Sequence, residues 1–131
     1  MIRFIVHVES KREYIYDNNK LKQSCYPNKD IENKWLAEYL DKAEYLNIVL
    51  DKSPCIFTGD YISHYQTIRT DGFWVWSSDF LHYTKNFNFI WPEDFMIHVK
   101  ENLNNSNAIS YDRLLSLGDN FSFDKLSEGY L

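Results

Sequence analysis

The sequence has little of the material from which metal, redox and phosphate-binding sites are usually built. Only two cysteines occur, Cys25 and Cys55, and they form no C-x-x-C pair. This spacing excludes a thiolate zinc site and argues against an obligatory disulfide. Four glycines in 131 residues leave almost nothing from which to build a glycine-rich phosphate loop. We therefore expect free thiols in a cytoplasmic protein that uses no cofactor and binds no metal.

Long apolar runs and an excess of basic residues are missing as well. No apolar stretch is long enough to cross a bilayer, and the first residues alternate with charge, unlike a signal peptide. Acidic residues outnumber basic ones by 19 to 14, which gives a formal net charge of −5. Such a charge disfavours direct binding to nucleic acid or to an anionic membrane and suits a basic protein partner.

Recognisable catalytic signatures are also lacking. The sequence contains no H-E-x-x-H, no G-x-S-x-G, no P-loop and no dinucleotide fingerprint. His82 and His98 have no carboxylate or cysteine at metal-ligand spacing. Asp60 and His64 are the nearest approach to an acid–base pair, but four residues along a strand would separate them by roughly 13 Å. We therefore predict no catalytic residues, no metal ligands and no enzymatic activity.

Aromatic residues, in contrast, are abundant and organise the predicted fold. They make up 18% of the chain, which argues against disorder, and the length suits a single domain over residues 1–131. Asp71-Gly72 between two strand-like runs predicts a hairpin with a type I′ turn. In that register Thr70 faces Phe73 and Ile68 faces Val75. Arg69 shares the other face with Trp74 and Trp76, where a cation–π contact with an indole is expected.

The remaining elements complete an α+β fold, a central antiparallel sheet around this hairpin with helices packed on it. The periodicities predict strands over Ile2–Val8 and Tyr14–Tyr16, a turn and loop over residues 17–27, and a helix from Asp30 to about Leu46. Further predicted elements are short strands over Ile48–Leu50 and Cys55–Thr58, a turn at Gly59-Asp60, an incoming hairpin arm over Tyr61–Thr70, and helices over Ser78–Phe87, from Pro92 and from Ser110 to Gly118. Both faces of the hairpin carry large apolar side chains, so it should lie between layers.

Several of these residues form a pattern that resembles a group of small bacterial proteins. The pattern consists of Thr70-Asp71-Gly72-x-Trp74-x-Trp76, Asp79-Phe80-x-x-Tyr83, Pro92-Glu93-Asp94-Phe95 and His98-Val99, with Trp35-Leu36-x-x-Tyr39-Leu40 and Val49-x-Asp51 upstream. It is similar to uncharacterised proteins and to immunity proteins encoded beside polymorphic or contact-dependent growth-inhibition toxins. The resemblance spans roughly residues 30–100 and departs at Ser77-Ser78, where proline is usual, and at Ile90-Trp91, where leucine is usual.

The resemblance implies a protein that neutralises a cognate toxin domain by stoichiometric binding. Immunity proteins of this kind need no catalytic residues and are often acidic when the toxin is a basic nuclease. We expect the contact at the turn that holds Asp60 and Tyr61, because an acid flanked by tyrosines offers both charge and contact area. The full set of candidate contact residues is Asp60, Tyr61, Tyr65, Asp51, Glu38 and Asp41.

An alternative function remains open at this stage. A small ligand-binding protein or enzyme could use the aromatic ribbon around Trp74 and Trp76 as the wall of a pocket. A deep pocket lined by these indoles and a histidine would favour the alternative, and a flat or convex acidic patch would favour the immunity protein. Tryptophans that flank a hairpin are more often core residues than ligand platforms.

Overall fold

One antiparallel sheet forms the middle of the protein. The computed structural model describes residues 3–26, 34–49, 52–62, 66–103 and 109–120. In this part of the chain five strands are arranged in the order β2-β1-β5-β4-β3. They are β1 (Arg3–His7), β2 (Glu13–Tyr16), β3 (Glu44–Val49), β4 (Thr67–Thr70) and β5 (Trp74–Ser77), and every neighbouring pair is antiparallel. The fold is α+β, as the sequence predicts.

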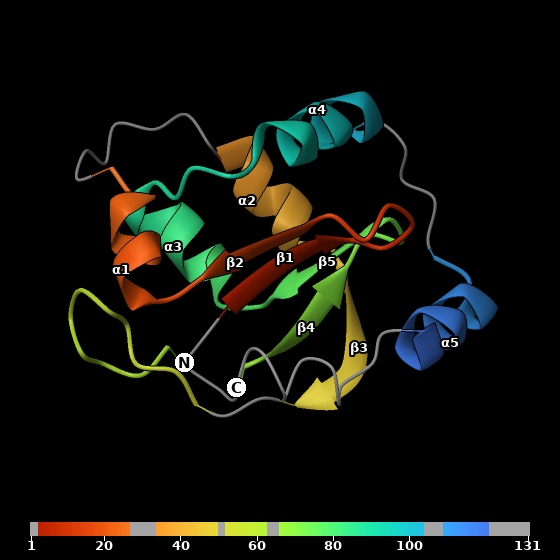
Figure 1. The fold of residues 1–131 in the computed structure, drawn as a ribbon, viewed down its shortest axis with the longest axis horizontal. Helices are drawn as coiled ribbons and strands as arrows, with labels where there is room; N and C mark the ends of the chain where they lie inside the picture. Colours follow the sequence, from red (N-terminus) through yellow and green to blue (C-terminus); the bar gives the residue numbers. More distant parts are fainter. Residues whose placement is uncertain (1–2, 27–33, 50–51, 63–65, 104–108, 121–131) are drawn as a thin grey trace.

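Helices cover both faces of the sheet, so the hairpin lies between layers, as predicted (Figure 1). One face carries α1 (Asn18–Gln23), α2 (Lys34–Asp41), α3 (Phe80–Phe87) and α4 (Glu93–Asn102), and the other carries α5 (Tyr111–Asn120). On the first face Trp74 and Trp76 pack with Phe80 and Phe95. On the α5 face the buried residues are Phe4, Val6, Leu46, Ile68, Val75 and Leu117.

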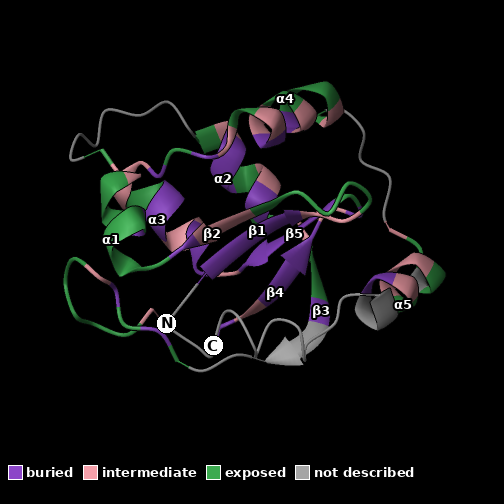
Figure 2. Ribbon diagram, in the orientation of Figure 1, coloured by how far each residue is buried: buried purple, intermediate pink, exposed green. Residues whose placement is uncertain are grey.

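Strand β1 is more deeply buried than its alternating pattern predicts. It lies inside the sheet between β2 and β5, and Figure 2 shows it buried along most of its length. Phe4 and Val6 belong to the core on the α5 face, and Ile5 is also fully buried, in the layer of the other helices. Arg3 is buried as well. A strand covered on both faces needs apolar residues at every position, and Arg3 is tolerated there because it is paired, as described below.

The hairpin lies where the sequence predicts it, but its register differs by two residues. Arg69 is opposite Trp76 and Thr70 is opposite Val75, so the two central turn residues are Gly72 and Phe73. Gly72 has a φ of 98° and no other residue of this turn has a positive φ, so the turn is not type I′; glycine first is typical of type II′. Because the shift is an even number, each strand residue keeps its predicted face. Phe73, however, is half exposed instead of belonging to the core.

Other boundaries differ from the prediction for identifiable reasons. Residues 18–23 form helix α1 instead of a loop, since Asp17 caps it by accepting from the Lys20 amide at 2.7 Å. Helix α2 ends at Asp41, and Glu44 already belongs to β3. Residues 55–58 form a turn instead of a strand. The predicted helix start at Asp30 lies outside the described residues, as does the end of the predicted strand at Leu50.

Candidate functional site

The Asp60–Tyr61 loop has a backbone fixed by its own hydrogen bonds. The Gly59 amide donates to the Cys55 carbonyl at 2.8 Å, and the Cys55 amide donates to the Asp60 carbonyl at 2.7 Å. The Ile62 amide donates to the Ser53 carbonyl at 3.0 Å. Gly59 takes a φ of 79°, a value that glycine adopts without strain. The predicted turn at Gly59-Asp60 is thus confirmed, and its side chains project from a defined support.

The side chains of this loop are open to solvent (Figure 2). Tyr61 is 67% exposed and Phe57 is 42% exposed. Asp60 is exposed too, and among the described residues no hydrogen bond or ion pair engages its carboxylate. Phe57 stacks on Phe87 of α3 with ring centroids 4.4 Å apart, and the Lys52 ammonium lies 5.9 Å from the Tyr61 ring. The loop therefore presents aromatic area and one unpaired carboxylate.

The other candidate residues fall into two groups. Glu38 and Asp41 are both exposed on α2, three residues apart and so on one side of the helix. Asp51 and Tyr65 lie outside the described residues, as does His64 of the Asp60–His64 pair. The sequence thus placed two acids correctly on the helix surface.

A cavity of about 430 Å³ lies beside the Asp60–Tyr61 loop. Tyr61 forms part of its wall, with Tyr45 of β3, Arg69 of β4, and His82 and Lys85 of α3. The Arg69 guanidinium donates to the backbone carbonyls of Asp41 at 2.8 Å and Ala43 at 2.5 Å. Of the candidate contact residues that the structure describes, only Tyr61 lines the cavity.

The indoles proposed as a pocket wall are core residues. Trp74 and Trp76 are 3% and 1% exposed, and each packs against Phe95, with ring centroids 5.4 and 5.6 Å apart. Neither lines the cavity described above. The predicted cation–π contact also has a different partner, since the Arg69 guanidinium lies 4.1 Å from the centroid of the Tyr45 ring instead of an indole.

A polar cluster at the hairpin tip, missed from the sequence, joins Asp71 to two helices. One carboxylate oxygen accepts from the Tyr39 hydroxyl at 2.5 Å and faces His98 Nε2 at 2.9 Å. The other oxygen accepts from the amides of Phe73 and Trp74 at 3.0 and 2.8 Å. Burial opposes ionisation of Asp71, but hydrogen bonds from His98, Tyr39 and the two amides together hold its pKa below the usual value.

A carboxylate, a hydroxyl and an imidazole together resemble an acid–base site, but the contacts of this cluster hold parts of the fold together. The second histidine nitrogen, His98 Nδ1, lies 3.3 Å from the Asn102 amide nitrogen, on the same helix. Tyr39 comes from α2, His98 from α4 and Asp71 from the turn, so the cluster ties three elements together. All three residues occur in the resemblance pattern, and three polar residues within a pattern of core residues are the signal that would have identified the cluster.

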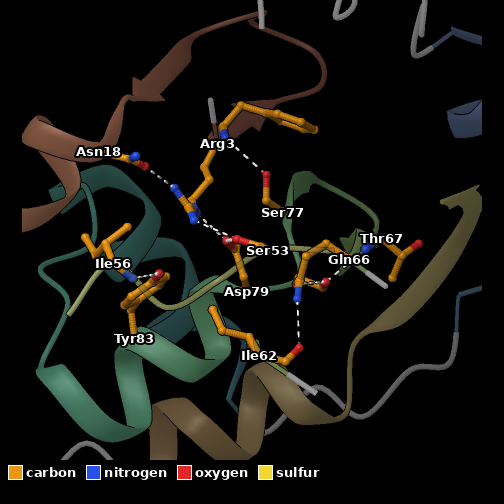
Figure 3. A network of polar contacts seen from close by, with 12 residues as sticks. Arg3, Asn18, Ser53, Ile56, Ile62, Gln66, Thr67, Ser77, Asp79 and Tyr83 are labelled. Carbon is orange, nitrogen blue, oxygen red and sulfur yellow. Dashed lines mark hydrogen bonds and ion pairs between the residues drawn. The ribbon is translucent and has the colours of Figure 1, made fainter. Parts of the chain in front are cut away.

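At the other end of β5, Asp79 pairs with the buried Arg3 (Figure 3). Arg3 also donates to Ser53 Oγ at 2.7 Å and to Asn18 Oδ1 at 3.0 Å. Asp79 directly precedes α3 but makes no side-chain capping hydrogen bond to it, and its carboxylate is engaged in the ion pair instead. Burial raises the pKa of Asp79, and Arg3 opposes that shift.

Within the described ranges no three histidine, cysteine or acidic side chains are grouped so that they could hold a metal ion, and both cysteines are free thiols. In the same ranges no helix has the length and apolar character needed to cross a membrane. No family model matches the sequence, and no curated protein and no solved structure matches it significantly.

Proposed function

We propose that the protein is an immunity protein that binds a cognate bacterial toxin domain in the cytoplasm and blocks it stoichiometrically. The observation that carries the proposal is the Asp60–Tyr61 loop, where an unpaired carboxylate adjoins two exposed aromatic rings on a fixed backbone. The resemblance pattern supports the same function independently of this loop, because neither Asp60 nor Tyr61 belongs to it.

The loop has the properties of an interface anchor. Tyrosine offers a large contact area with a polar tip and is enriched among the residues that dominate binding energy. A loop already held by three backbone hydrogen bonds loses little conformational entropy on binding. A free carboxylate can take a lysine or arginine from a basic partner, and the net charge of −5 would speed encounter with it.

The test is calorimetric titration against the toxin domain that this proposal expects the neighbouring upstream gene to encode, as the C-terminal part of a large secreted protein. We expect Asp60→Ala and Tyr61→Ala each to weaken binding by roughly 2 kcal/mol, with little change in thermal stability. The association rate should fall as salt rises, and less so in Asp60→Ala. Matched controls are Glu101→Ala, an exposed acid on α4, and Tyr26→Ala, a tyrosine that is 57% exposed outside this loop.

The outcomes separate the function from the site. No complex with that domain, and no protection of cells that express it, would refute the immunity function. Complex formation with unchanged affinity in both loop variants would exclude the Asp60–Tyr61 loop and leave Glu38 and Asp41 on α2 as the contact surface.

A second candidate function is a small-ligand-binding protein, and the cavity favours it. Its volume of about 430 Å³ lies within the range of small-molecule sites. In that case the residues that matter would be those lining the cavity, not the indoles of the hairpin. Saturable binding of a small molecule that substitutions in the cavity wall abolish, together with no complex with the toxin domain, would favour this second function.

A further inference from the structure

Exposed aromatic side chains gather around the cavity. Among the described residues the two most exposed large apolar side chains are Tyr61 and Tyr45, at 67% and 59%, and both line it. They come from different elements, Tyr61 from the loop that holds Asp60 and Tyr45 from β3. Ile62 and Leu81 add aliphatic surface to the wall. Exposed apolar side chains that meet around a hollow are typical of a contact site.

Three of the polar side chains that line the cavity, Gln66, Thr67 and Ser78, are already hydrogen-bonded inside the protein. Ser78 Oγ donates to Gln66 Oε1 at 2.7 Å, and Thr67 Oγ1 donates to the Leu46 carbonyl at 3.3 Å. Gln66 Nε2 donates to the Ile62 carbonyl at 3.1 Å (Figure 3). These side chains need no partner from outside. The surface that the cavity offers is therefore mainly that of its rings and aliphatic side chains.

The charge around the cavity disfavours a lysine or arginine from the toxin domain. Arg69 and Lys85 line the cavity, and no described residue that lines it is acidic. A second cation would lose hydration and meet two charges of its own sign. The basic residues expected of the toxin domain should therefore bind elsewhere, with Asp60 as the candidate partner.

A carboxylate is disfavoured as well, because it would lose water and gain little. Arg69 is 4% exposed, and one of its terminal nitrogens already donates to the carbonyls of Asp41 and Ala43. Lys85 is exposed, so solvent weakens its attraction for a group inside the cavity. Burying a charge without a close partner is costly. The group that suits this cavity is therefore uncharged.

The size and the walls of the cavity favour an aromatic ring. An apolar cavity of about 150 Å³ can already hold benzene, and this one measures about 430 Å³. Aromatic rings attract one another in offset and edge-on contacts, and Tyr45 and Tyr61 supply two ring surfaces. The Arg69 guanidinium lies 4.1 Å from the centroid of the Tyr45 ring. This contact holds the ring before binding and reduces the entropy that binding would cost.

We propose that this cavity receives one uncharged aromatic side chain of the toxin domain, which packs against Tyr45 and Tyr61. The proposal rests on the proposed immunity function and extends its site, since Tyr61 belongs both to the Asp60–Tyr61 loop and to the cavity wall. The toxin domain then makes two contacts of different chemistry, a basic residue with Asp60 and an aromatic anchor in the cavity. Aromatic anchors in desolvated pockets dominate the binding energy of many interfaces.

The first test fills the cavity and measures binding of the toxin domain by calorimetry. Lys85→Trp places an indole at the cavity from an exposed position of α3. We expect the dissociation constant to rise by about thirtyfold or more, the size of a hot-spot contact. Lys100→Trp, the same substitution at an exposed position of α4, is the matched control and should bind like the wild type. Lys85→Ala removes the charge without filling the space and should stay within about threefold of the wild type.

The outcomes separate this proposal from the immunity function. A wild-type complex that Asp60→Ala weakens but Lys85→Trp leaves unchanged would overturn the filled cavity alone and leave the cavity free for a small ligand. Equal losses in Lys85→Trp and Lys85→Ala would also overturn it, because the lysine itself would then be the contact. If thermal denaturation shows that Lys85→Trp does not fold, Asn86→Trp fills the cavity from the next residue of α3.

The second test identifies the group that enters. The toxin domain is isotope-labelled, the immunity protein is not, and isotope-filtered nuclear Overhauser effects are recorded in the complex. We expect signals between aromatic ring protons of the toxin domain and the methyl groups of Leu81, which lines the cavity and is assigned with the Leu81→Ile variant. Signals from aliphatic, lysine, arginine or acidic side chains in place of a ring, or no signal at Leu81 within a formed complex, would overturn the proposal.

Discussion

Acidic side chains occupy two contrasting environments in this molecule. Asp71 and Asp79 lie buried at the two ends of β5, each engaged by partners from other elements. Asp60 lies on an exposed loop, and no side chain in the described ranges pairs with it. The first two belong to the resemblance pattern and Asp60 does not. A pattern composed of interior anchors reports on the fold, so the residues that select a partner should be sought outside it.

The largest expected effect comes from breaking the buried Arg3–Asp79 pair. Arg3→Ala should lower the free energy of unfolding by about 3–5 kcal/mol, because it leaves the Asp79 carboxylate buried without its cation. Chemical denaturation measures the change. Arg12→Ala is the comparison, since Arg12 pairs with Asp94 at the surface, and it should cost far less. Similar losses in both variants would contradict the contrast between buried and exposed pairs.

The next effect concerns Asp71 and depends on pH. Asp71→Asn should lower stability by about 2 kcal/mol at neutral pH, because a neutral amide cannot replace the ionised acceptor of four hydrogen bonds. The folded protein holds the pKa of Asp71 below its usual value of about 3.9. The contribution is therefore complete above that value and is lost as the pH falls through the lower folded pKa.

Denaturation curves of wild type and Asp71→Asn at several pH values check this sign. The difference between the two proteins should stay constant from pH 7 down to about 4 and shrink at lower pH. A difference that stayed constant, or grew, in acid would mean that Asp71 is not held ionised by its contacts with Tyr39 and His98.

Gly72→Val should come third, with a loss of more than about 1 kcal/mol. The cause is backbone conformation, because Gly72 has a φ of 98°, whereas an added Cβ would meet Ile109 at an ordinary 3.5 Å. Phe73→Val, the same new side chain one residue later at an exposed position without a positive φ, is the control. Thermal denaturation that places Gly72→Val within a degree of wild type would contradict the turn geometry.

The smallest effect is expected at Asp60. Asp60→Asn should change the free energy of unfolding by less than about 0.5 kcal/mol, because the exposed side chain makes no contact that the substitution would break. Paired denaturation curves at neutral pH measure it. A loss of unfolding free energy comparable to that of Asp71→Asn would show that Asp60 has a structural role. Asp60 would then not be free to bind a partner.

The sequence predicted the hairpin's position but not its register, and Asp71 explains why. The Asp-Gly dipeptide favours a two-residue turn at Asp71-Gly72. In the structure the Asp71 side chain accepts from the amides of Phe73 and Trp74, which moves the turn one residue along. The carboxylate is held there by Tyr39 and His98, and contacts between residues distant in the sequence leave no local signal.

Some predicted boundaries of helices and strands are wrong for a related reason. Leu46 continues the three-residue spacing of Leu40 and Ala43, which suits a helix. It also suits a strand that is buried on the α5 face, and the pairing of β3 with β4 determines that it is a strand. Helix α1 has one buried residue, Leu21, so its periodicity is too weak to detect. For the candidate site, the turn and the surface acids were predictable, whereas the cavity required knowledge of how β4 and α3 pack.

The place of β1 in the sheet has a consequence for how the chain folds. The hairpin β1–β2 and the meander β3–β4–β5 each join strands that are close in sequence, but within the sheet the two halves meet where β1 pairs with β5. Closing so long a loop is entropically slow. During synthesis the edge of β1 that pairs with β5 therefore stays unpaired until β5 has left the ribosome. That interval, not the finished structure, is when the chain is most exposed to aggregation.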